Sequence, residues 1–106
     1  MNEEPSDVEM LTNRRIIGSR LVKELRNRNY TLDAHYKLVG KDWLHIFVGD
    51  EEHYDGFSDV TLRFIISYMR EHNFIPFWYG IADSRHIEIR FFKDIVKLKL
   101  LRGAER

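Results

Sequence analysis

The sequence predicts an α+β fold in which two helices lie on one face of an antiparallel sheet. Two amphipathic helical stretches are each followed by two stretches of alternating apolar and polar residues, which gives the order α-β-β-α-β-β. The chain has 106 residues, the size of one domain. Hydrophobic residues make up 43% of it, enough for a packed core. We therefore expect a single domain over residues 1–106, with residues 1–5 as a disordered tail.

The first predicted helix begins at Ser6 and ends near Arg28. Ser6 and Glu9 have the spacing of a capping box, in which each side chain satisfies a free backbone amide of the first turn. Gly18 is a point at which this helix could bend. Asn29 is typical of a residue that ends a helix in the left-handed conformation. The apolar side of the helix consists of Met10, Leu11, Ile17, Leu21, Val22 and Leu25.

The first hairpin is predicted from two alternating stretches, residues 30–38 and 43–48, joined by a turn. A three-residue loop from Gly40 to Asp42 gathers the aliphatic residues of both strands on one face. A two-residue loop would turn every side chain of one strand to the other face. We prefer the three-residue loop, which places Leu44, Ile46 and Val48 beside Leu38, Tyr36 and Ala34.

The second unit follows an acidic loop at residues 49–56. Ser58 is predicted to cap a helix over residues 59–72. The next strand contains Pro76, which cannot donate to a ladder, so this strand should be an edge strand or contain a bulge. With a turn at residues 83–85, the side chains expected to face the helices are Phe77, Tyr79, Ile81, Ile87, Ile89 and Phe91.

The C-terminal segment, residues 93–102, is compatible with two structures. Its alternation around Leu98 is typical of a fifth strand. The same residues would suit a short helix capped by Asp94 and stopped by Gly103. We favour the strand.

The two halves of the chain also resemble each other. Residues 21–30 can be aligned with residues 65–74, which places Asn29 on Asn73. After one deletion in the turn, Leu44 and Ile46 fall on Ile87 and Ile89. The pattern suggests an internal repeat of a helix-strand-strand unit, although any two such units share part of it.

Composition and motifs exclude several classes of function. The chain has no cysteine, which removes disulfides, thiolate metal sites and cysteine nucleophiles. No apolar run approaches the ~20 residues of a membrane span, and the N-terminus lacks the features of a signal peptide. There is no phosphate-binding glycine loop and no nucleophile elbow. We expect a cytoplasmic protein that is not an enzyme, with no cofactor, no small-molecule substrate and no membrane partner.

The histidines offer a weak argument for metal binding. His35, His45 and His86 fall on predicted strands, on the face away from the helices, and could approach one another. None has the spacing of helical metal ligands. His53 lies in the acidic loop, which lacks the ligand order of a calcium site. The sequence therefore predicts no metal site.

The strongest functional signal is the aromatic character of the face opposite the helices. A half-solvated sheet should be polar on that side, and a large exposed apolar patch usually marks an interface. A terminal segment folded over this face, or a different register, would remove the patch. The predicted binding residues are Trp43, Phe47, Phe74, Trp78, Arg90, Phe92, Lys37 and His45.

These residues predict a protein-interaction module, either a homodimer or a small adaptor or inhibitor. The alternative is nucleic-acid binding, with bases stacked on the same face or phosphates held by the basic first helix. The 17 basic and 17 acidic residues balance, whereas nucleic-acid-binding domains are usually basic. We therefore favour a protein partner. The basic residues of the alternative are Arg15, Arg20, Lys23, Arg26 and Lys97.

Overall fold

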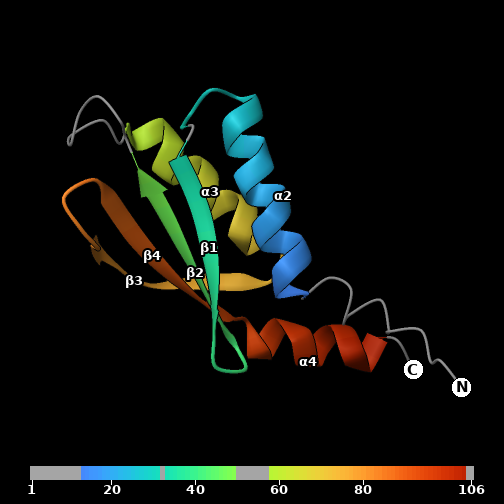
Figure 1. Cartoon of the computed structure of the whole chain (residues 1–106). Coiled ribbons are helices and arrows are strands. Elements are labelled where there is room, and N and C mark those ends of the chain that lie inside the picture. The colour runs from blue at the N-terminus through green and yellow to red at the C-terminus, as the bar shows by residue number, and fades with distance from the viewer. Residues whose placement is uncertain (1–12, 32, 50–57, 105–106) are drawn as a thin grey trace, which may run out of the picture.

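The computed structural model describes residues 13–31, 33–49 and 58–104 (Figure 1). The elements in this part of the chain are α2 (Arg14–Asn27), β1 (Asp33–Val39), β2 (Trp43–Gly49), α3 (Asp59–Glu71), β3 (Phe74–Ile81), β4 (His86–Lys93) and α4 (Ile95–Ala104). The predicted α+β class and the order of the two helix-strand-strand units are confirmed. The expected N-terminal tail, the capping box at Ser6 and the acidic loop with His53 lie outside the described residues.

The four strands form one antiparallel sheet in the order β1-β2-β4-β3. The predicted three-residue loop is confirmed, because Val39 pairs with Trp43. Gly40 has a φ of 56°, a left-handed conformation that glycine adopts without strain. The two hairpins meet through β2 and β4, where Ile46 pairs directly with Ile89.

The N-terminus of α2 differs from the prediction. Asn13 has an extended backbone, and its side chain accepts a hydrogen bond from the N–H of Ile16, so it caps the helix. The helix that carries Ile17 and Leu21 therefore begins at Arg14, and the prediction of one helix from residue 6 is wrong for this element. Asparagine is among the best capping residues, but the stretch before it is apolar enough to imitate a continuing helix.

An asparagine with positive φ follows each of α2 and α3, as predicted for α2. Asn29 follows α2 with a φ of 56°, and Asn73 follows α3 with a φ of 71°. Asparagine reaches this conformation more easily than other residues with a side chain. The start of α3 is also confirmed, since Ser58 accepts a hydrogen bond from the N–H of Thr61.

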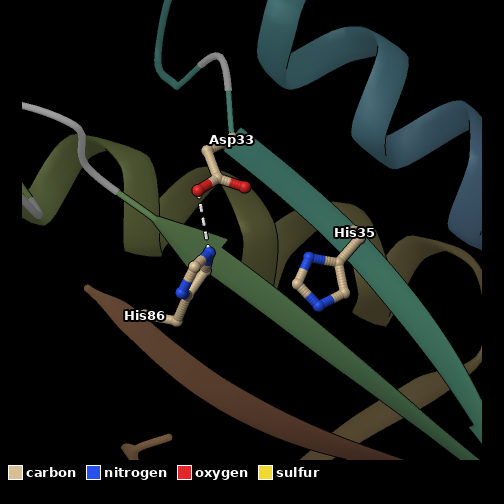
Figure 2. Close-up of side chains that lie close together, drawn as sticks. All are labelled: Asp33, His35 and His86. Atoms are coloured by element: carbon tan, nitrogen blue, oxygen red, sulfur yellow. Dashed lines mark hydrogen bonds and ion pairs between the residues drawn. The ribbon is translucent and has the colours of Figure 1, made fainter. Parts of the chain in front are cut away.

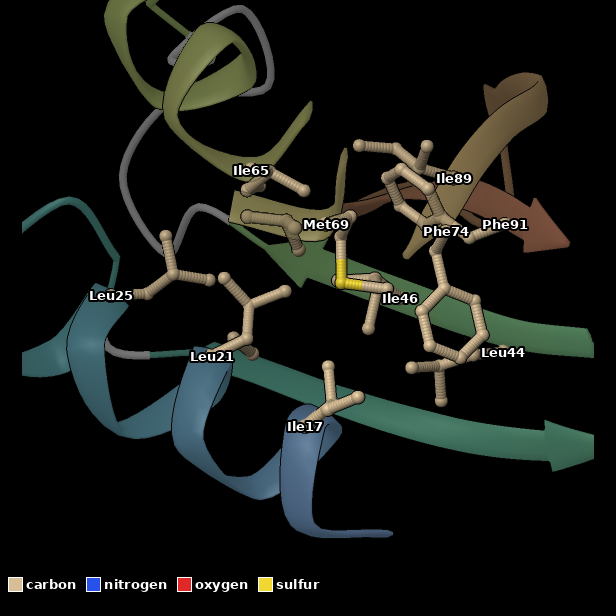
Figure 3. Close-up of a cluster of buried hydrophobic side chains, with 12 residues drawn as sticks. Ile17, Leu21, Leu25, Leu44, Ile46, Ile65, Met69, Phe74, Ile89 and Phe91 are labelled. Carbon is tan, nitrogen blue, oxygen red and sulfur yellow. The ribbon is translucent and has the colours of Figure 1, made fainter. Parts of the chain in front are cut away.

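One hydrophobic core lies between α2, α3 and one side of the sheet (Figure 3). Large side chains that are completely buried there include Leu21, Leu44 and Phe91. Both helices contribute to this single cluster, with α2 lying mainly against β1 and α3 against β3. The cluster consists of Ile17, Leu21, Leu25, Ala34, Leu44, Ile46, Val48, Ile65, Met69, Phe74, Ile89 and Phe91.

The side of the sheet that Phe74 and Phe77 occupy is the reverse of the prediction. A register shift between Pro76 and Trp78 confirms the predicted bulge. The strand order places β3 at the edge of the sheet, as also predicted. The extra residue reverses the alternation for everything before it. Phe74 therefore pairs with Lys93 and is fully buried in the core, not on the open face. Phe77 is 70% exposed and lies against Trp43 on the open face.

The C-terminal segment is a helix, and the prediction of a fifth strand is wrong. Asp94 caps α4, because its carboxylate accepts the N–H of Lys97 and its carbonyl accepts the N–H of Leu98. Both sides of β4 are already paired, with β2 and β3, so the chain leaving β4 has no adjacent free edge to join. Figure 1 shows α4 leading away from the sheet. None of the described helices has the length and apolar character needed to cross a membrane.

Candidate functional site

The open face of the sheet, opposite α2 and α3, consists of four rows of cross-strand neighbours. Paired residues in an antiparallel sheet share a face, so the registers define these rows directly. The rows, starting from the α4 end, are Val39–Trp43–Phe92–Ile75, then Lys37–His45–Arg90–Trp78, then His35–Phe47–Glu88–Gly80, and finally Asp33–Gly49–His86. All of the predicted binding residues except Phe74 lie in these rows.

The first row is an aromatic cluster centred on Trp43. The Trp43 ring meets Phe92 with centroids 5.0 Å apart and Phe77 with centroids 5.1 Å apart, both edge to face. Such pairs stabilise by roughly 0.5–1.5 kcal/mol beyond the area that they bury. Trp43 and Phe92 are half-buried as a result, whereas Phe77 remains exposed.

The second and third rows form a chain of contacts around Arg90. The Arg90 guanidinium lies 4.3 Å from the centre of the Trp78 ring, and its Nε donates to Glu88 at 2.9 Å. His45 Nδ1 lies 3.6 Å from the same Glu88 oxygen. The Trp78 indole covers Gly80, where a Cβ would come within 2.5 Å of the ring. The charged and aromatic groups predicted to bind a partner are thus largely engaged with one another.

Burial determines the electrostatics of the contacts around Arg90. Glu88 is only 7% exposed, which is uncommon for a carboxylate unless it is paired. Arg90 provides that partner. Burial lowers the pKa of His45, and the charge of Glu88 offsets this effect only in part. Burial therefore favours the neutral form of His45.

Among the described residues, the most exposed apolar side chains belong to the edge strand β3 and to α4, where Val96 and Leu100 are 72% and 71% exposed. Phe77, Tyr79 and Ile81 are 70%, 73% and 65% exposed, and no residue of the strand is charged. Tyr79 and Ile81 pair with Ile89 and Ile87 on the side of the helices, as predicted, but remain accessible. A groove of about 350 Å³ lies beside the strand and is lined by residues of α3, β3 and β4. These residues are Leu62, Ile66, Pro76, Phe77, Trp78, Tyr79 and Ile89.

The fourth row brings together polar groups at the other end of the face (Figure 2). His86 Nε2 lies 2.8 Å from Asp33 Oδ2, and His86 Nδ1 lies 2.9 Å from Asp83 Oδ1. The hydrogen bond to Asp83 is the main cause of a raised pKa of His86. The backbone N–H of Arg85 and the His86 ring lower the pKa of Asp83. The His35 ring lies 5.6 Å from that of His86.

The cationic residues of the nucleic-acid alternative do not form one surface. Arg15, Arg20, Lys23 and Arg26 are exposed on α2, and none forms an ion pair with another described residue. Lys97 belongs instead to α4, and its ammonium group contacts the carbonyl of Arg70.

Comparison with known proteins adds no assignment to these surfaces. No protein-family model matches the chain, and searches of curated proteins and of solved structures found no match either. Two sequence signals correspond to these surfaces: the uncharged run of β3, and the aspartates Asp33 and Asp83, which precede histidines by two and three residues.

Proposed function

We propose that this protein is a protein-interaction module that associates with a second copy of itself through the edge strand β3. The observation that supports this proposal is an uncharged edge strand of eight residues with Phe77, Tyr79 and Ile81 exposed. Soluble proteins usually protect such an edge with charges, since its free N–H and C=O groups can pair with another chain. In the part of the chain that the structure describes, the protection of this edge is limited to Pro76 and the adjacent bulge.

The opposite edge of the same sheet provides a direct comparison. Strand β1 presents Asp33, His35 and Lys37 on the open face, which is the usual way to discourage pairing. The two edges therefore differ in a way that favours association at β3 alone. A single associating edge produces a closed pair of chains and no open fibre.

A second copy is the partner that best fits these charges. In a two-fold symmetric interface each surface meets itself, so a charged strand would face its own charge. Strand β3 has no charge, and the net charge of the whole chain is zero. Antiparallel pairing of two β3 strands would join two four-stranded sheets and cover Phe77 together with part of the Trp43 cluster.

Replacing Phe77 and Ile81 together with lysine is expected to abolish self-association. A buried apolar anchor contributes about 2 kcal/mol or more at an interface, so each substitution should weaken the dimer by roughly 30-fold. Sedimentation velocity over a concentration series, with circular dichroism as the folding check, measures this change. Wild type should sediment as a dimer and the double variant as a folded monomer.

Val60→Lys is the matched control, because Val60 is also an exposed apolar residue, 58% accessible, at the start of α3. It should leave the dimer unchanged. A wild-type protein that stays monomeric at high micromolar concentration would refute self-association, and the exposed strand would then require a different protein partner.

Binding of duplex nucleic acid through α2 is the second candidate. It is supported by four exposed cations, Arg15, Arg20, Lys23 and Arg26, that no described carboxylate neutralises. Four phosphate contacts predict a slope of about −3.6 in a plot of log affinity against log salt concentration. Fluorescence anisotropy with labelled duplexes measures this slope, and Arg15→Ala/Arg26→Ala should reduce it by about half. Absence of binding at low salt would eliminate this candidate.

A further inference from the structure

We propose that Asp33, His35 and His86 form a binding site for a transition-metal ion of the zinc class at the end of the open face. Each residue offers one ligand atom, and these atoms all lie within 4.8 Å of one another. Figure 2 shows the three side chains converging from β1 and β4. Two imidazoles and one carboxylate are a donor set that zinc uses, with water in the remaining position.

Gly49 provides the room for this arrangement. It lies on β2 between Asp33 and His86, in the same row of the sheet. A Cβ at this position would come within 2.6 Å of Asp33 Oδ2 and 2.8 Å of His86 Nε2. Its backbone is not left-handed, so glycine is needed here for space and not for conformation. Glycine weakens a strand interior, and a close approach of groups above it is a recognised reason to find one there.

Asp83 orients the His86 ring for metal binding. Both of its carboxylate oxygens lie within 3.0 Å of His86 Nδ1, which leaves Nε2 directed at Asp33. Histidines that bind metals usually donate their other ring N–H to a carboxylate in this way. When the metal binds His86 Nε2, the proton between Nε2 and Asp33 Oδ2 would be released to solvent.

His35 is held in position by its stack on Phe47. The two rings are 4.7 Å apart and nearly parallel, at 5°. A tetrahedral zinc site with bonds of about 2.0–2.2 Å places its ligand atoms roughly 3.4 Å apart. The ligand atoms now lie within 4.8 Å of one another, so metal binding requires them to approach by up to about 1.4 Å. His35 is exposed, so an ion can enter directly from solvent.

Calorimetric titration of chelator-treated protein with Zn²⁺ tests the site. One ion per chain is expected, and His35→Ala and His86→Gln should each weaken binding by at least tenfold. Asp83→Asn should weaken it by about tenfold while the stoichiometry stays at one, because Asp83 only positions a ligand. Gly49→Ala should separate Asp33 from His86 and lose the site in a folded protein.

His45→Gln is the matched control, since His45 lies on the same face two rows away and contacts Glu88 instead. It should bind zinc as wild type does. In NMR spectra, added Zn²⁺ should shift the ring signals of His35 and His86 and leave those of His45 in place. No binding by wild type, or equal binding by His35→Ala, would overturn the proposal. The exposed position of His35 makes a folding defect in that variant unexpected.

Discussion

Replacing Phe74 with alanine is expected to lower the free energy of unfolding by about 3–5 kcal/mol. The Phe74 ring is fully buried in the core, next to residues of α3 and β4 (Figure 3). Removing the ring loses the free energy gained by transferring it from water into the core. It also leaves a cavity that the surrounding side chains fill only partly. Because small domains are stable by about 5–15 kcal/mol, this one change would remove a large part of the total. Urea denaturation followed by circular dichroism measures it.

Phe77→Ala is the matched comparison, three residues further along the same strand. Phe77 is 70% exposed and its main contact is the aromatic pair with Trp43, so its loss should change the stability of the monomer by no more than about 0.5–1.5 kcal/mol. The measurement belongs at low protein concentration, where association does not contribute. Equal effects of the two substitutions would show that the bulge, and with it the register of β3, is wrong.

Replacing Gly18 with alanine is expected to destabilise the protein by about 1–3 kcal/mol. In most helix interiors this substitution stabilises by up to about 1 kcal/mol. Here the added Cβ would come within 2.6 Å of Cγ of Tyr36, whose ring packs against the α2 backbone. The Tyr36 hydroxyl also hydrogen-bonds with Ser19 Oγ at 3.1 Å, so the ring cannot simply move aside. Thermal and urea denaturation both report the change.

A double-mutant cycle isolates the cause of this effect. In a Tyr36→Ala background the obstacle is absent, so Gly18→Ala should become neutral or stabilising. If Gly18→Ala stabilises the otherwise wild-type protein, the close approach of Tyr36 to α2 is not present in solution.

The register of the first hairpin could be predicted because two independent signals agreed, although β1 begins at Asp33 and not at Tyr30 as predicted. Its turn contains Gly40, and only a three-residue loop gathers Leu44, Ile46 and Val48 with the aliphatic residues of β1. Its open face also carries polar residues such as Lys37, which fix the phase of the alternation. Where one face is polar and the other apolar, a register error is visible in the sequence.

The second hairpin lacked that contrast. Every residue of β3 is apolar or glycine apart from the tyrosine hydroxyl, so no polar side chain indicates where the alternation is interrupted. The bulge could be anticipated from Pro76, but its position could not, and Phe74 and Phe77 were placed on the wrong sides. The prediction of a strand for the C-terminal segment was wrong for a related reason. Its alternation of apolar and polar residues is typical of a strand, and only the pairing of β4 on both sides favours the helix that Asp94 caps.

The candidate sites could be predicted only as members of a face. The sequence indicates that Trp43, His45 and Arg90 share one side of the sheet. It does not indicate that Arg90 is engaged by Trp78 and Glu88, because this depends on rotamers and on the space above Gly80. Asp33 and His86 are 53 residues apart, and only the full strand order brings them into contact.

The direct pairing of Ile46 with Ile89 determines how the chain must fold. Each helix-hairpin unit can form from contacts close in sequence, but β2 meets β4 only after α3 and β3 have been traversed. Docking of the two hairpins is therefore a non-local step, and we expect its loop-closure entropy to slow folding. Until it occurs, both central strands expose a free edge. A chain whose two hairpins have not yet met would therefore be open to pairing with other chains at both of these edges.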